Sequence, residues 1–206
     1  MDGYREKTLA YYRENAQSFI DSTVQIDFTS VQDRFIALLP KDARVLDFGC
    51  GAGRDTAYFI SRGIIVDAVD GSEEMVAAAR ELTGTDVRQM LFTELDCHDL
   101  YDGIWACSSI LHCPVDELRE VFLRMIDALI NGGILYTSFK YGTFEGERNG
   151  RYFTNMTEDK FNEFIKGYPM LSVEDLWITG DVRPGRGDEK WLNLIMRKAA
   201  SGKEEP

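Results

Sequence analysis

Short apolar runs and amphipathic stretches alternate along most of the chain. The apolar runs have the length of buried strands and cover residues 45–48, 64–69, 87–92, 104–107 and 134–140. Between them, apolar residues recur at intervals of three and four, as over 118–129, which predicts helices. Strands that alternate with helices in this way predict an α/β fold with a mostly parallel sheet.

Two helices are expected ahead of the first strand. Tyr12, Ala16 and Phe19 share one side of a helix over residues 4–20, so that side should pack on another part of the protein. A second helix is expected over residues 30–39, opening at a serine and stopped by a proline.

The later part of the chain is less regular. The helix over 118–129 should end at Asn131-Gly132-Gly133, because glycine often follows the last helical turn. Residues 140–159 contain several glycines and no usable period, so we expect a long loop over the carboxyl edge of the sheet, where substrates commonly bind. Residues 171–178 and 191–197 predict a closing β-hairpin.

Composition narrows the class of protein. The chain has 206 residues, of which 44% are hydrophobic, and this suits one core of ordinary size, so we expect a single domain over 1–206. The formal net charge of −12 counts against a nucleic-acid partner, because the average surface repels phosphate. No apolar run approaches the roughly 20 residues of a membrane span, and the first residues lack a hydrophobic signal core. These features predict a cytoplasmic protein without membrane attachment.

The cysteine pattern gives no indication of a metal site. Cys50, Cys97, Cys107 and Cys113 contain no C-x-x-C pair among them. We expect reduced thiols in or near the core, and no zinc site.

The most informative motif follows the first strand. Glycines at 49, 51 and 53 lie between the strand over 45–48 and a helical pattern, a spacing that lets the backbone approach a ligand closely. The helix that follows directs its first N–H groups toward anionic atoms. The next strand ends at Asp70, an acid placed where such folds bind the hydroxyls of a ribose. The ligand is therefore predicted to be a nucleoside.

The residue at position 54 distinguishes between two cofactor-binding motifs. The dinucleotide fingerprint G-x-G-x-x-G laid on Gly49 and Gly51 requires glycine at position 54, where this chain has Arg54. The run D-F-G-C-G-A-G-R-D over 47–55, followed by Asp70, instead resembles the first two motifs of the class I S-adenosylmethionine-dependent methyltransferases. The resemblance covers about residues 40–140. It implies a Rossmann-like fold with a seven-stranded, mostly parallel sheet, helices on both faces and an antiparallel last strand.

The resemblance also implies an organisation of the domain. Residues 1–40 would form a helical lid, 41–140 the cofactor-binding core, and 141–200 the substrate-side loop, helix and hairpin. Tyr11, Tyr12 and Phe19 would reach the cofactor from the lid, although packing on the sheet would explain them equally well.

Roles for individual residues follow from the same resemblance. The glycine turn would approach the methionine part of S-adenosylmethionine, Asp70 the ribose, Met75 the ribose and adenine, and Glu94 the exocyclic amine. Met75 could instead be a plain core residue, and Asp96 or Asp99 could replace Glu94. The cofactor-binding residues implied in this way are Asp47, Gly49, Cys50, Gly51, Asp70, Gly71, Met75, Phe92, Thr93, Glu94, Ser108 and Tyr12.

The stretch over 101–114 resembles the family's fourth strand and its active-site turn. His112 would lie near the transferred methyl group, where its imidazole could take a proton from the acceptor or only hydrogen-bond to it, or simply pack in the loop. Candidates for binding a carboxylate or phosphate of the substrate come from the loop over 140–159. They are Arg148, Arg151 and Tyr152, with Arg183, Arg186 and Trp191 as secondary candidates.

We therefore expect an enzyme that transfers the methyl group of S-adenosylmethionine to a small molecule, leaving S-adenosylhomocysteine. The methyl group is already activated by the sulfonium, so the protein mainly supplies alignment. Two alternatives stay open: a methyltransferase acting on a protein or RNA, and a non-catalytic module that binds S-adenosylmethionine. A nicotinamide oxidoreductase is disfavoured by Arg54.

Overall fold

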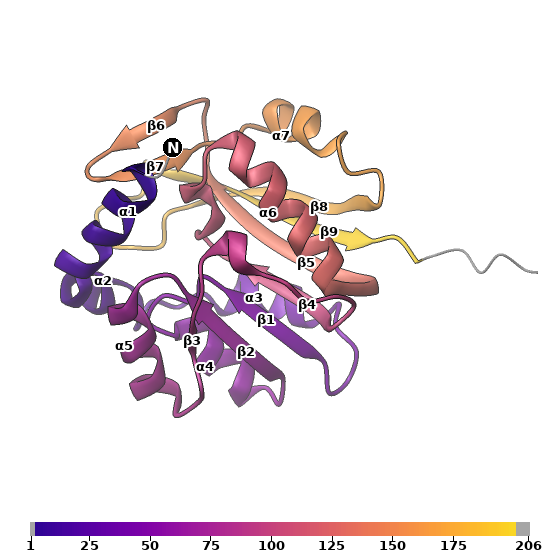
Figure 1. Cartoon of the computed structure of the whole chain (residues 1–206), viewed down its shortest axis with the longest axis horizontal. Helices are drawn as coiled ribbons and strands as arrows, with labels where there is room; N and C mark the ends of the chain where they lie inside the picture. Colours follow the sequence, from indigo (N-terminus) through magenta and orange to yellow (C-terminus); the bar gives the residue numbers. More distant parts are fainter. Residues whose placement is uncertain (1–2, 201–206) are drawn as a thin grey trace, which may run out of the picture.

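A seven-stranded sheet forms the centre of the computed structural model, which describes residues 3–200 (Figure 1). Its strands are β1 Arg44–Phe48, β2 Ile65–Asp70, β3 Arg88–Gln89, β4 Tyr101–Ala106, β5 Leu129–Lys140, β8 Leu171–Gly180 and β9 Lys190–Lys198. The order across the sheet is β3-β2-β1-β4-β5-β9-β8. Strands β1 to β5 pair in parallel, whereas β9 is antiparallel to both β5 and β8. The predicted fold class is confirmed.

Helices cover both faces of this sheet. They are α1 Gly3–Glu14, α2 Ala16–Thr23, α3 Thr29–Ile36, α4 Arg54–Ser61, α5 Glu73–Thr83, α6 Val115–Ala128 and α7 Glu158–Ile165. Successive residues of β1 point to opposite faces, as the period of a strand requires: Val45 packs in the cluster of Phe35 and Phe59, and Leu46 in that of Phe122. Thus α3 and α4 lie on one face, and α6 on the other.

Large aromatic side chains fill the core beneath α3 and α4. Trp105 of β4 stacks on Tyr136 of β5, with ring centroids 3.9 Å apart and an interplanar angle of 16°. Gly103 leaves the space that Phe35 occupies, because a Cβ at this position would lie 2.7 Å from the Phe35 ring. The stacked pair fixes the central strands whose carboxyl ends carry the site.

Two sequence predictions about where a strand and a helix end are wrong. The strand expected over 87–92 is limited to Arg88–Gln89, because the chain then turns into the short 3₁₀ helix η1, Phe92–Glu94. The helix before β5 ends at Ala128, not at Asn131-Gly132-Gly133. The backbone from Leu129 onward already belongs to β5, and Leu129 pairs with Tyr101.

The loop expected over 140–159 contains a β-hairpin, β6 Glu145–Arg148 and β7 Arg151–Thr154. Its turn is Asn149-Gly150, and both residues have positive φ, 50° and 76°. Asn-Gly is the preferred pair for this type of hairpin turn, so the dipeptide was a usable signal in the sequence.

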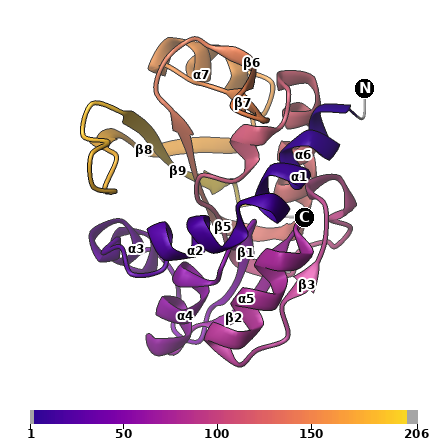
Figure 2. The same ribbon diagram turned by 90° about the vertical axis from the view of Figure 1, so that its left-hand side faces the viewer.

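The N-terminal segment differs slightly from its prediction. The helix expected over 4–20 is divided at Asn15 into α1 and α2, and the next helix begins at Thr29. Figure 2 shows α1 and α2 crossing the side of the molecule near the end of β1. None of the helices within residues 3–200 has the length and apolarity needed to cross a membrane.

Candidate functional site

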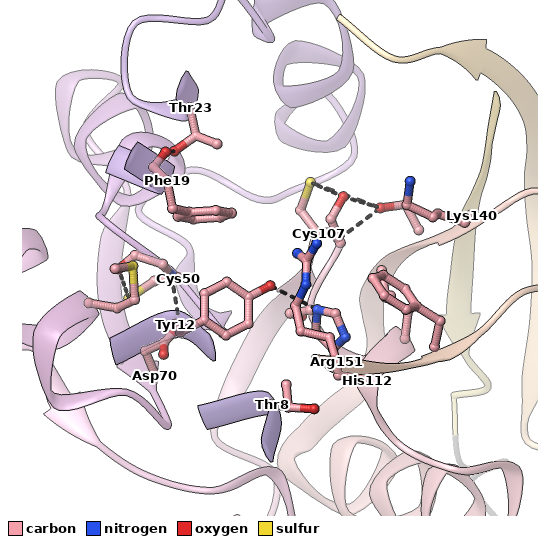
Figure 3. Close-up of a pocket in the computed structure, with 18 of the residues that line it drawn as sticks. Thr8, Tyr12, Phe19, Thr23, Cys50, Asp70, Cys107, His112, Lys140 and Arg151 are labelled. Carbon is pink, nitrogen blue, oxygen red and sulfur yellow. Dashed lines mark hydrogen bonds between the residues drawn. The ribbon is translucent and has the colours of Figure 1, made fainter. Parts of the chain in front are cut away.

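The site is a pocket at the carboxyl ends of β1, β2 and β4, where the strand order reverses between β1 and β4. This is the position at which open α/β sheets bind their ligands. Side chains from α1 and α2 cover the pocket, and β7 and the ends of β8 and β9 complete its rim. Figure 3 shows Tyr12 in the middle, with Cys50 and Asp70 on one side and His112 and Arg151 on the other.

The glycine turn has the conformation that its sequence predicts. Gly49 has φ of 85°, and a Cβ there would lie 2.4 Å from the Cβ of Ser109, so a side chain cannot fit. The backbone N–H groups of Gly49 and Cys50 both donate to the carbonyl of Val69, at 2.9 Å each, which holds the turn against the end of β2. Gly51 has φ of 54° and also lines the pocket. The turn therefore exposes bare backbone to a ligand.

Asp70 is bound tightly to this turn. Its Oδ2 accepts from the backbone N–H of Gly51 at 2.8 Å, and its Oδ1 accepts from that of Ser72 at 2.9 Å. Burial raises the pKa of Asp70, although both hydrogen bonds act against the rise. The carboxylate is thus held at the pocket wall in a fixed orientation.

The structure places Asp47 behind the pocket wall, contrary to its predicted contact with the cofactor. Its side chain points away from the pocket lining and accepts a hydrogen bond from the Thr56 hydroxyl at 2.5 Å. Burial and the nearby charge of Asp55 raise the pKa of Asp47 to about 8.

Asp55 lines the pocket instead, and it is a site residue that the sequence did not identify. Its carboxylate accepts from Arg54 at 2.7 Å, from the Trp105 indole at 2.8 Å and from Gln32 at 2.7 Å. Burial acts to raise the pKa of Asp55, but Arg54 and these hydrogen bonds outweigh it, and the net shift is downward. The pair of Arg54 and Asp55 is therefore ionised.

On the side of β3, the pocket is apolar. Gly71, Met75 and Phe92, which the family resemblance assigns to cofactor binding, line it. Met90 and Leu91, which the sequence did not identify, line it as well. Thr93 and Glu94 do not line the pocket. The Glu94 carboxylate turns back to accept from the backbone N–H of Leu91 at 2.7 Å, because it caps the 3₁₀ helix η1.

His112 and Tyr12 meet in the middle of the pocket. The Nδ1 of His112 lies 2.6 Å from the Tyr152 carbonyl, which can only accept, so Nδ1 carries the proton. Nε2 then accepts from the Tyr12 hydroxyl at 2.8 Å (Figure 3). Burial lowers the pKa of His112 to about 4, and the charges of Arg151 and Lys140 add to the effect. The imidazole is therefore neutral at pH 7.

Of the three primary substrate candidates, Arg148, Arg151 and Tyr152, Arg151 alone lines the pocket. Its guanidinium stacks over the Tyr11 ring, 4.1 Å from the centroid. Arg148 pairs directly with Arg151 across the hairpin but does not line the pocket. Its guanidinium lies over Phe144, 5.0 Å from the centroid, and over Phe153 at 5.2 Å. The Tyr152 hydroxyl donates to Glu145 at 3.3 Å, outside the pocket.

The rim gathers residues from distant segments. Ser108 lines the pocket as predicted, and so do the secondary candidates Arg183, Arg186 and Trp191. Lys140 and Asp181 also line it, although the sequence did not point to them. Asp181 accepts from Arg183 at 2.9 Å and from the Trp191 indole at 3.2 Å, so the loop between β8 and β9 is internally bonded. Within residues 3–200 no group of three or more His, Cys, Asp or Glu side chains is arranged to hold a metal ion.

Comparisons with known proteins agree with this geometry. A methyltransferase-domain family model matches residues 45–133. A methyltransferase of Staphylococcus carnosus is 28% identical over 165 residues, which cover 76% of this chain and 79% of that protein. The trans-aconitate 2-methyltransferase of Mycobacterium tuberculosis is 34% identical over 113 residues, 52% of this chain but only 40% of its own length.

Among solved structures, the Burkholderia thailandensis 1,6-didemethyltoxoflavin-N1-methyltransferase, with S-adenosylhomocysteine bound, superimposes with a TM-score of 0.74. It is 25% identical, and the match covers 93% of this chain and 85% of that one.

The sheet order and the glycine turn at its switch point define a Rossmann-like nucleotide-binding protein. The family model and the structural neighbours support a class I S-adenosylmethionine-dependent methyltransferase, with S-adenosylmethionine as its cofactor.

Proposed function

We propose that the chain transfers the methyl group of S-adenosylmethionine to a small molecule that binds beside Tyr12, His112 and Arg151. The observation that carries this proposal is the division of one covered pocket into two sides. The glycine turn and Asp70 form one side, and the Tyr12–His112 pair, Arg151 and the β8–β9 rim form the other. Two relatives, named for trans-aconitate and for 1,6-didemethyltoxoflavin, act on small molecules, which supports an acceptor of that size.

The residues on the first side fit the cofactor. Asp70 presents a carboxylate whose remaining lone pairs can accept from the ribose hydroxyls. Gly49 and Gly51 leave the backbone bare, so the methionine part can approach it closely. Met75, Leu91 and Phe92 supply an apolar surface for the adenine ring.

The cofactor, when bound, supplies a methyl group that its sulfonium has activated. The chain's own residues then have to align the acceptor and exclude water. The helices α1 and α2 provide the cover through Tyr12 and Phe19, whose rings meet edge to face 5.2 Å apart. Tyr12 orients the acceptor through its hydroxyl oxygen, because the neutral imidazole of His112 accepts the hydroxyl proton and holds the group in one direction.

Isothermal titration with S-adenosylmethionine, S-adenosylhomocysteine and NADH tests the cofactor part of this proposal. We expect micromolar binding of the two sulfur nucleosides and none of NADH. Asp70→Asn should weaken the binding of S-adenosylhomocysteine by about 1 to 3 kcal/mol, since a charge-assisted hydrogen bond to a hydroxyl is lost.

The matched control is Glu73→Ala, which removes an exposed carboxylate three residues away, outside the pocket. It should leave the affinity unchanged. An Asp70→Asn protein that folds normally and binds as tightly as the wild type would show that the ribose assignment is wrong.

A further inference from the structure

The cationic side chains that line the acceptor side of the pocket differ in whether an acidic side chain neutralises them. Its cationic lining residues are mostly neutralised by acids of the chain. Arg54 pairs with Asp55 at 2.7 Å, and Arg5 with Glu117 at 2.6 Å. The pairs at the rim are Arg183 with Asp181, Lys140 with Glu189, and Arg186 with Glu189.

Arg151 is the exception. Within residues 3–200 no carboxylate lies within salt-bridge distance of its guanidinium. Its Nε–H is buried and has no hydrogen-bond partner there. A buried donor without a partner, on a charged group, is costly unless a ligand satisfies it. In a chain of net charge −12, an acid could have been placed beside Arg151, so the unpaired charge indicates a ligand.

Aromatic rings hold the guanidinium in place without neutralising it. Arg151 stacks over Tyr11 at 4.1 Å from the ring centroid and lies 5.1 Å from the centroid of Phe153. A guanidinium fixed on rings keeps its fork of N–H donors available, and little side-chain entropy is lost when an anion binds. Figure 3 shows the group beside Tyr12 and His112, away from Asp70 and Cys50.

We propose that the methyl acceptor carries a carboxylate, which Arg151 binds in the pocket. This inference rests on the proposed function and names the substrate class of the same site. The planar fork of Arg151 matches a carboxylate in two parallel hydrogen bonds. One unneutralised guanidinium also balances one negative charge. Arg5, Arg54 and Arg183 each have an acid of their own, whereas Lys140 and Arg186 share Glu189. A phosphate dianion, which would call for more unpaired cationic charge, is therefore tested as a separate probe.

The geometry at His112 agrees with an ionised acceptor. Its Nδ1 donates to the Tyr152 carbonyl and its Nε2 accepts from Tyr12, so neither nitrogen is available to take a proton from the acceptor. Arg151 can orient a carboxylate without any such proton transfer.

The test uses the wild-type complex with S-adenosylhomocysteine and a panel of small monocarboxylates, each paired with its primary amide. Ligand-observed NMR measures binding, and inorganic phosphate is a third probe. We expect at least one acid to bind tenfold or more tightly than its amide. Arg151→Gln should remove that preference, and Arg151→Lys should retain part of it. The affinity for S-adenosylhomocysteine should stay within twofold in both variants.

Arg148→Gln is the matched control, because Arg148 lies on the same hairpin but outside the pocket. It should leave both affinities unchanged. The proposal is overturned if no acid is preferred over its amide, or if phosphate binds better than every acid. It is also overturned if Arg151→Gln weakens the binding of S-adenosylhomocysteine and leaves the preference for the acid unchanged, because Arg151 would then pair with the cofactor's carboxylate. If the wild type binds no S-adenosylhomocysteine at all, the proposed function fails, which is a separate result.

Discussion

At the scale of single residues, His112 links the site to the stability of the fold. It is buried and neutral, with a pKa lowered to about 4 mainly by burial. In the unfolded chain the imidazole titrates near its ordinary value of about 6.5. Between these two values the unfolded state binds more protons than the folded state, so the contribution of His112 to stability falls as the pH falls.

His112→Asn is expected to remove this pH dependence. The free energy of unfolding of the wild type, relative to the variant, should decrease by about 2 kcal/mol between pH 7.5 and pH 5. Urea denaturation at both pH values measures it. Asp47, whose pKa burial raises to about 8, makes stability change in the opposite direction, but it is present in both proteins and cancels in the difference. A difference that is constant with pH would contradict the buried, neutral assignment of His112.

At the scale of elements, α2 is the least buried of the α-helices within residues 3–200. None of its residues is buried, yet Phe19 and Thr23 line the pocket. Segments with few buried contacts open at low free energy cost, and ligand contacts stabilise them most.

S-Adenosylhomocysteine should therefore slow amide hydrogen exchange in α2 by about tenfold or more, since closing the lid adds contacts that the helix otherwise lacks. Mass spectrometry of the exchanged peptides measures this. The helix α6 is the internal control, because its apolar face is already buried in the core and should be affected little. Equal exchange in α2 with and without the ligand would show that α2 is not a lid.

The elements of the fold differ in how well the sequence predicts them. The central strands were predictable because their apolar runs are buried on both faces, as at Val45 and Leu46. The hairpin β6–β7 was missed although Asn149-Gly150 indicates its turn, because its strands carry charged residues and lack a clear period. The end of α6 was misplaced because pairing between Leu129 and Tyr101 overrides the local glycine signal.

At the scale of the whole molecule, the residues of the glycine turn could be predicted from one motif, whereas the contacts between residues on the acceptor side could not. Gly49, Gly51 and Asp70 belong to consecutive elements, so a short motif describes them. Tyr12 and His112 are 100 residues apart in the sequence, and the packing of α1 against β7 and α5 brings them together. The unpaired charge of Arg151 depends on where every acid of the chain lies, which no local pattern records.

Because the pocket lies between the lid, the sheet and the hairpin, its ligand should stabilise the entire fold. S-Adenosylhomocysteine at about 100 times its dissociation constant should add about 2.7 kcal/mol to the free energy of unfolding. For a chain of this length, each kcal/mol raises Tm by about 2 to 4 °C, so the expected rise is about 5 to 10 °C. Calorimetry measures the rise, with NADH at the same concentration as the control. NADH should cause no shift, because Arg54 stands where the dinucleotide turn needs its third glycine.

The Asp70→Asn variant should need roughly 5 to 150 times more S-adenosylhomocysteine for the same rise in Tm, which is the loss of affinity expected for that variant. An equal shift with NADH would mean that the glycine turn recognises a nucleotide in general and does not select the sulfur nucleoside.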